Sequence, residues 1–195
     1  MKKIIAFSTL VFILSGSALA FDNPVNPKHP GRGIFVGGDL GYGYYDAPTN
    51  NLVSSSDLNA LAWYINIGFQ FNPYVALEGG YLQFNGAQVA ANNYAINAKV
   101  HGDSLLLKLI YPFKNKYSVF GKLGFMEMYA QTTGAGGVSS NLQGNNRATP
   151  ELGVGGGYNL SQHVIAQAQE LVTFSVGSLP ATYSTLVGVR YLFNM

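Results

Sequence analysis

Residues 61–71 read LAWYINIGFQF, and this stretch decides the fold class. One set of alternate positions is apolar: Leu61, Trp63, Ile65, Ile67, Phe69 and Phe71. The other set carries Tyr64, Asn66, Gly68 and Gln70. Because successive side chains of a strand point to opposite faces, this period of two predicts a β-strand with one apolar face. The stretch is also as long as the roughly 9–11 residues that a tilted strand needs to cross a membrane.

The same alternation recurs seven more times along the chain. The further strands are predicted at residues 33–45, 74–84, 103–113, 117–131, 149–160, 164–174 and 183–193. An even number of such segments, joined in sequence, predicts an all-β fold: an eight-stranded antiparallel up-and-down transmembrane β-barrel. The segment 164–174 alternates poorly, since placing Gln167 and Gln169 inside leaves Glu170 on the apolar face. A β-bulge near Gln169 would restore the alternation.

Composition separates a membrane barrel from the other classes. Charged residues make up 10% of the chain, against about 25% in soluble domains. After residue 20 no apolar run reaches the roughly 18 residues of a transmembrane helix. The polar face of the strands is rich in glycine, which suits a narrow eight-stranded interior. A soluble barrel would instead carry many Lys and Glu residues on its outer face.

The N-terminus has the pattern of an export signal. Lys2 and Lys3 precede the apolar residues 4–14, and Ala18-Leu19-Ala20 forms a small-x-small cleavage site. The predicted organisation is a signal peptide at 1–20, a Pro-rich periplasmic leader at 21–32 and the barrel at 33–195. Without the two signal lysines, nine of the 11 Lys and Arg residues remain and balance nine Asp and Glu residues. No basic patch remains to bind nucleic acid.

The connections alternate in length. Short turns are predicted at 72–73, 114–116 and 161–163, and long polar loops at 46–59, 85–102, 130–148 and 175–182. In outer-membrane barrels the short turns are periplasmic and the long loops extracellular. Aromatic girdles are expected at both membrane surfaces: Tyr42, Tyr44, Trp63, Tyr81 and Tyr129 on the loop side, and Phe71, Tyr111, Phe113, Tyr158, Tyr191 and Phe193 on the turn side.

Five charged side chains are predicted to face the lumen: Asp39, Glu78, Lys108, Lys122 and Arg190. Lys108 and Lys122 are equally far from the turn at Asn115, so they face each other and repel unless a carboxylate such as Glu78 lies between them. Buried charges must be paired, so these residues would plug the lumen. A small pore gated by the same charges is the alternative.

An enzymatic function, such as lipid hydrolysis, has one candidate cluster: His101, Asp103 and Ser104. Asp103 and Ser104 point to opposite faces of a strand, which opposes a catalytic triad. The chain has no cysteine and its three histidines are scattered, so no metal site is expected. We therefore expect no catalytic residues and no cofactor.

Several motifs resemble those of OmpA-type transmembrane domains and opacity-like surface antigens. They are NPYVALEGGY at 72–81, LKLIYP at 107–112, VFGKLG at 119–124, TPELGVGGGY at 149–158 and GVRYLF at 188–193. The resemblance implies a structural or surface-exposed, antigen- or adhesin-like barrel in the outer membrane of a Gram-negative bacterium. It implies as partners outer-membrane lipid, lipopolysaccharide, periplasmic chaperones and the barrel-assembly machinery, with the four loops open to a surface ligand.

The resemblance also assigns individual residues. Gly188, Tyr191 and Phe193 match the assembly signal, although Asn194 and Met195 follow where family members commonly end on the aromatic residue. Glu78 and Lys108 match an acid–base pair that helps to gate the lumen. Gly157 and Gln167 stand where its further partners, an acid and an arginine, are expected. No peptidoglycan-binding domain is expected.

Overall fold

The computed structural model describes residues 31–46, 59–91, 94–114, 116–134, 139–140, 148–176 and 181–194. The predicted signal peptide and all of the predicted leader except Gly31 and Arg32 lie outside these ranges. The long strands are β1 (Gly33–Asp46), β2 (Asn59–Asn72), β3 (Val75–Ala91), β4 (Tyr94–Phe113), β5 (Tyr117–Gly134), β7 (Ala148–Asn159), β8 (Val164–Thr173) and β9 (Ala181–Asn194). The short β6 (Ser139–Ser140) pairs with β5 alone.

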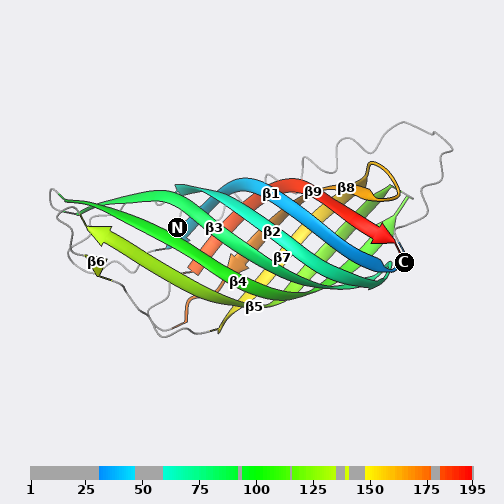
Figure 1. Cartoon of the computed structure of the whole chain (residues 1–195), viewed down its shortest axis with the longest axis horizontal. Helices are drawn as coiled ribbons and strands as arrows, with labels where there is room; N and C mark the ends of the chain where they lie inside the picture. Colours follow the sequence, from blue (N-terminus) through cyan, green and yellow to red (C-terminus); the bar gives the residue numbers. More distant parts are fainter. Residues whose placement is uncertain are drawn as a thin grey trace, which may run out of the picture.

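These strands close into a barrel, as Figure 1 shows. Each long strand pairs antiparallel with its neighbour in sequence, β9 pairs with β1, and the pairing of β4 with β5 completes the ring. The predicted eight-stranded up-and-down barrel is therefore confirmed. No helix in the described part of the chain is long and apolar enough to cross a membrane.

The predicted faces of the strands are also found. Leu40, Ile67 and Leu105 are about 60% exposed on the outside, whereas Phe35 and Tyr64 are fully buried inside. Such a large exposed apolar surface requires lipid, because soluble monomers rarely expose contiguous apolar patches beyond a few hundred Å².

The expectation of a bulge in β8 is wrong. Its burial alternates without interruption, and its pairing with β7 and β9 shows no register shift. Gln167 and Gln169 lie inside the barrel, and Glu170 lies on the outer face. Regular pairing on both sides fixes the register, so one unfavourable side chain does not shift it.

The predicted loop 85–102 is mostly strand instead. β3 continues to Ala91 and β4 begins at Tyr94, with the pairing interrupted only between Phe84 and Ala87. The predicted loop 130–148 likewise begins with strand, since β5 extends to Gly134. Cross-strand backbone hydrogen bonds form whatever the polarity of the side chains, so the polar composition of these stretches placed the strand ends too early.

The lumen has two apolar layers. We call the end with the long connections the loop end, and the opposite end, where β2 meets β3, the turn end. Near the loop end lie Ala60, Ala62, Tyr64, Leu82, Phe84, Val100, Met126, Met128, Leu171 and Leu186. Near the turn end lie Phe35, Ala76, Ile110, Phe120 and Leu192. The charged side chains lie between these two layers.

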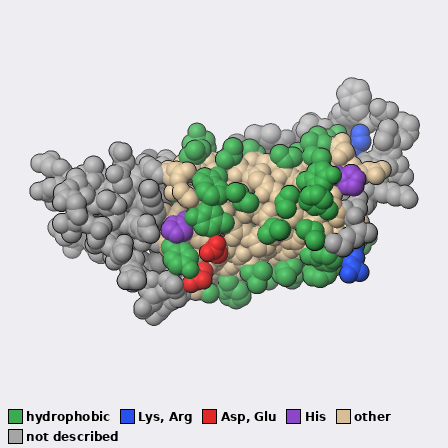
Figure 2. All heavy atoms as spheres, in the orientation of Figure 1, with side chains coloured by type: hydrophobic (Ala, Val, Ile, Leu, Met, Phe, Trp, Pro, Cys, Tyr) green, Lys and Arg blue, Asp and Glu red, His purple; other side chains and the backbone are tan. Residues whose placement is uncertain are grey.

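The outer surface is banded as expected for a membrane protein. Aromatic pairs such as Trp63–Tyr81 mark the loop end, and Tyr117–Tyr158 marks the turn end. In the space-filling view, hydrophobic side chains cover much of the visible face, and acidic side chains gather near the loop end (Figure 2). This arrangement agrees with aromatic girdles at two membrane surfaces.

Candidate functional site in the barrel lumen

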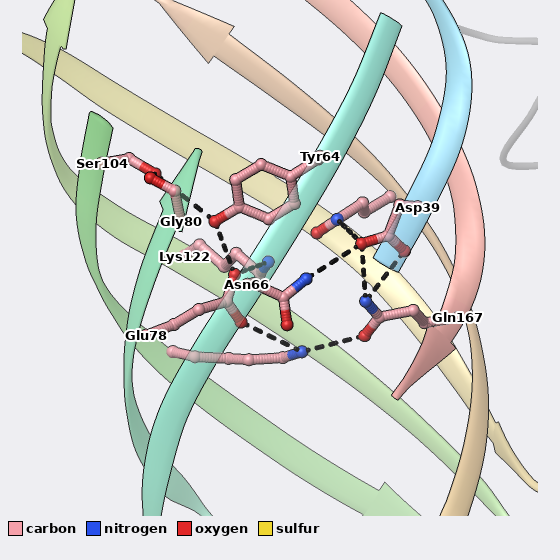
Figure 3. A network of polar contacts seen from close by, with 10 residues as sticks. Asp39, Tyr64, Asn66, Glu78, Gly80, Ser104, Lys122 and Gln167 are labelled. Carbon is pink, nitrogen blue, oxygen red and sulfur yellow. Dashed lines mark hydrogen bonds and ion pairs between the residues drawn. The ribbon is translucent and has the colours of Figure 1, made fainter. Parts of the chain in front are cut away.

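Glu78 on β3 is the centre of a buried charge network, drawn in Figure 3. Its Oε1 accepts hydrogen bonds from Lys122 Nζ at 2.5 Å and from the Tyr64 hydroxyl at 2.9 Å. Its Oε2 lies 3.8 Å from Lys108 Nζ. Lys108 and Lys122 are direct cross-strand partners on β4 and β5. The carboxylate therefore lies between the two facing lysines, where the spacing of the sequence predicts it.

A second carboxylate, Asp39 on β1, is held by amides. It accepts hydrogen bonds from Gln167 Nε2 at 2.9 and 3.1 Å, from Asn66 Nδ2 at 3.1 Å and from Gln169 Nε2 at 3.2 Å. Gln167 also accepts a hydrogen bond from Lys108 Nζ at 3.3 Å. This one amide joins the two halves of the network, which thereby crosses the lumen from β3 to β1 (Figure 3).

Aromatic rings enclose the lysines. The Lys108 ammonium lies 3.8 Å from the centre of the Phe120 ring, and Lys122 lies 5.3 Å from that of Tyr64. A cation above an aromatic face is stabilised by the ring quadrupole, more strongly when water is excluded. Both lysines are at most 2% exposed, so the two contacts add to their pairing with Glu78.

Gly80 shows why the lumen face contains so many glycines. A Cβ at this position would collide with the ring of Tyr64 from the neighbouring strand. Without that Cβ, the ring lies across the lumen and its hydroxyl reaches Glu78. The polar network thus depends on a missing side chain on β3.

Two further buried charges lack such partners. Neither carboxylate oxygen of Glu151 on β7 has a hydrogen-bond partner among the described residues, and Glu151 is fully buried. Arg190 lies 4.9 Å from the centre of the Phe35 ring, but its Nε and Nη1 atoms are likewise unpartnered. Arg190 pairs in register with Gly37 rather than with Asp39, and no ion pair joins it to Asp39.

Glu151 was not among the residues predicted to face the lumen. Gly157 carries no acid, and the lumen-facing acid of β7 is Glu151, nearer the loop end. The signal was available, because Glu151 alternates in phase with Gly153, Gly155 and Gly157. Tyr64, Asn66 and Gln169 were on the predicted inner faces, but their hydrogen bonds depend on how the barrel closes.

The other candidate residues lie at the surface or the rim. His101 stacks on Tyr129 with ring centres 5.3 Å apart, and Asp103 is exposed, whereas Ser104 faces the lumen. His101, Asp103 and Ser104 therefore do not form a triad. No group of three or more acidic or histidine side chains in the described ranges is arranged to hold a metal ion.

The predicted assembly signal lies on β9. Tyr191 packs against Phe193 with ring centres 4.7 Å apart and stacks on His163 at 5.7 Å. Gly188 lies beside Asp39, with no room for a Cβ. The two aromatic side chains face outward at the turn end. Their part in assembly stays a prediction.

Comparisons with solved structures show similar barrels. The chain is similar to Neisserial surface protein A, with a TM-score of 0.62 at 15% identity over 82% of this chain and 97% of that one. It is similar to Ail, the attachment invasion locus protein of Yersinia pestis, with a TM-score of 0.59 at 15% identity over 84% and 99%. The N-terminal barrel domain of Pseudomonas aeruginosa OprF gives 0.56 at 15% identity over 84% and 99%. At these identities the likeness shows the fold alone.

Sequence comparison identifies the family. A search of curated proteins gave no match. The family model described as the OmpA-like transmembrane domain matches residues 31–190, which is most of the chain. The protein therefore belongs to the OmpA-like transmembrane domain family and is an eight-stranded β-barrel of the outer membrane.

Proposed function

We propose that the protein is a surface-exposed structural barrel whose lumen is closed by its own charged side chains. One observation carries the proposal: Glu78, bound to Lys108 and Lys122, is fully buried between two apolar layers. Six charged residues in the described lumen are buried, three acidic and three basic: Asp39, Glu78, Glu151, Lys108, Lys122 and Arg190. Side chains of this volume and balance fill an eight-stranded interior.

Energetics favour a plug over an open channel. Removing one partner of a buried ion pair leaves an uncompensated charge, which costs about 3–5 kcal/mol. An ion that enters the lumen would have to displace Lys122 from Glu78 and also pass apolar side chains on either side. Both steps oppose conduction.

Single-channel recording in planar bilayers tests the plug. We expect silent bilayers from folded wild-type protein and current steps from Glu78→Ala, because that variant frees two mutually repelling lysines. Glu127→Ala, at the loop end outside the lumen, is the matched control and should be silent. Steady wild-type currents that Glu78→Ala leaves unchanged would contradict the plug.

A charge-gated pore is the second candidate, and the unpartnered Glu151 favours it. Glu151 lies one inward position from Lys122 across the β5–β7 pair, since Lys122 pairs with Gly153 and Gly124 with Glu151. A second carboxylate near Lys122 offers this lysine an alternative partner. Brief wild-type openings that Glu151→Gln abolishes would support the pore over the plug.

The surface role rests on the family and on the loops. The similar protein Ail is an attachment invasion locus protein, and one Ail structure contains the heparin analogue sucrose octasulfate. In the described part of this chain, the outward charges at the loop end include Asp103 and Glu127, whose sign does not suit a sulfated sugar. The described outward charges at this end therefore do not favour a polyanionic ligand.

Bacterial adherence tests that role. Replacing residues 141–147 with a short Gly-Ser linker should lower the adherence of expressing bacteria to cultured epithelial cells, while bilayers stay silent. If the replacement of each of the four loops left adherence equal to that of wild type, a surface-binding role would be contradicted. The protein would then be a purely structural barrel. Immobilised heparin serves as the polyanion control and should not retain the protein.

A further inference from the structure

Glu170 is a charged side chain on the lipid-facing surface that the lumen does not use. It points outward from β8, where its pairing partner on β7 is Val154. It lies two residues from Val172, which pairs with the aromatic Tyr183 near the loop end. Glu170 makes no hydrogen bond or ion pair with another described residue. A charged side chain on the lipid face costs free energy that depends on its depth in the membrane, so such a residue is a candidate for a functional contact.

Small side chains lie next to Glu170 on its own strand, flanked by Val154 and Val187 on the neighbouring strands. Its outward neighbours toward the turn end are Ala166 and Ala168, and Ala168 pairs with Gly156 on β7. Elsewhere the outward positions mostly carry large apolar or aromatic side chains. Small residues let two membrane-embedded backbones approach closely, which increases their van der Waals contact.

A hydrogen-bond donor lies next to this carboxylate. Thr185 on β9 is the direct cross-strand partner of Glu170, and it is exposed. The patch thus holds an acceptor and a donor side by side. A two-fold contact requires such self-complementarity, because residue i of one copy meets residue j of the other and the reverse.

We propose that this surface is the interface between two copies of the chain in the membrane. We name it the β8 patch and define it as Gly156, Ala166, Ala168, Glu170 and Thr185. In the dimer, the Glu170 carboxylate of each copy accepts a hydrogen bond from the Thr185 hydroxyl of the other. The two-fold axis runs along the membrane normal, since both copies are inserted in the same direction. The inference does not depend on whether the lumen conducts.

The patch favours a second copy over other occupants. Acyl chains offer no hydrogen-bond donor to a carboxylate. A transmembrane partner with a basic residue would pair with Glu170 but would offer no acceptor to the Thr185 hydroxyl beside it. A second copy satisfies both groups at once.

Single-cysteine cross-linking tests the interface, because the native chain has no cysteine. Ala168→Cys places a thiol in the patch, and Leu77→Cys places one on the outward face of β3, across the barrel. After oxidation of outer membranes, Ala168→Cys should give a disulfide-linked dimer at several times the yield of Leu77→Cys. Equal yields, or a cross-link to a different protein only, would overturn the proposal.

Substitution of Glu170 then tests the polar contact. Glu170→Leu in the Ala168→Cys chain should weaken association about tenfold, as expected for losing two hydrogen bonds between membrane-embedded segments. Glu170→Gln, which retains an acceptor, should keep most of the dimer. Only folded barrels, identified by their heat-dependent gel mobility, are counted. Undiminished cross-linking in Glu170→Leu would overturn the proposed contact.

Discussion

The lumen contains two kinds of buried acid. Glu78 binds Lys122, Lys108 and the Tyr64 hydroxyl, while Glu151, equally buried, has no hydrogen-bond partner among the described residues. Both acids stand on the same inner face and look alike in the alternation of the sequence. Their difference comes from the side chains that nearby strands place beside each acid: β2, β4 and β5 bring Tyr64, Lys108 and Lys122 to Glu78.

This difference teaches that burial and pairing are separate properties. Glu78 faces two lysines that repel each other, so its charge stabilises both of them. Glu151 lies near the loop end of the network, where the neighbouring lumen side chains are mainly apolar. The Glu78 side of the lumen should therefore resist change, and the Glu151 side should tolerate it.

Glu78→Ala should have the largest effect. It leaves Lys108 and Lys122 facing each other without a counter-charge, and we expect a loss of about 3–5 kcal/mol in the free energy of unfolding. Urea titration in lipid vesicles, followed by the fluorescence of the single tryptophan, Trp63, measures it. Glu127→Ala is the control, with a change below about 0.5 kcal/mol, as for surface substitutions. A loss for Glu78→Ala as small as that for Glu127→Ala would mean that Glu78 has no stabilising partners, and its distinction from Glu151 would be lost.

Asp39→Ala should come next. The substitution leaves amide donors of Gln167, Gln169 and Asn66 without their acceptor, but it exposes no facing pair of like charges. We expect a loss of about 2–3 kcal/mol, in the range for hydrogen bonds to a charged group. Asp39→Asn, which keeps one acceptor oxygen, should recover part of it in the same titration. No recovery would mean that the charge, rather than the hydrogen bonds, is what matters.

Tyr64→Phe should have a smaller effect on the free energy of unfolding, and it tests one partner of Glu78. It removes only the hydroxyl that donates to Glu78, so the expected loss is about 1 kcal/mol. Gly80→Ala should cost more than Tyr64→Phe, since the added Cβ displaces the whole ring. The two variants measured side by side separate the hydrogen bond from the position of the ring. The reverse order would contradict the packing of Tyr64 over Gly80.

Glu151→Gln should have the smallest effect, within about 0.5 kcal/mol or slightly stabilising. No hydrogen bond is lost, and a neutral amide is cheaper to bury than an unpaired carboxylate. The same urea titration checks it. A loss comparable to that of Glu78→Ala would show that Glu151 has a partner of equal strength.

The fold could be predicted from the sequence because apolar and polar residues alternate in nearly every strand. The facing pair Lys108 and Lys122 could also be predicted from the sequence, since a tight turn at Asn115 fixes the register of their strands. The hydrogen bonds that link Lys108 through Gln167 to Asp39 could not be predicted, because they join strands far apart in sequence across the closed barrel. Glu170 shows the opposite failure: regular alternation places it on the outer face, and a bulge would have been needed to move it, but β8 has none.

A pair of double-mutant cycles tests the central claim most directly. The first combines Glu78→Ala with Lys122→Met, and the second combines Glu151→Ala with Lys122→Met. We predict a coupling of at least about 1.5 kcal/mol in the first cycle and below about 0.5 kcal/mol in the second, within the range that such cycles resolve. Equal couplings, or a larger one for Glu151, would contradict a lumen closed by the Glu78 network.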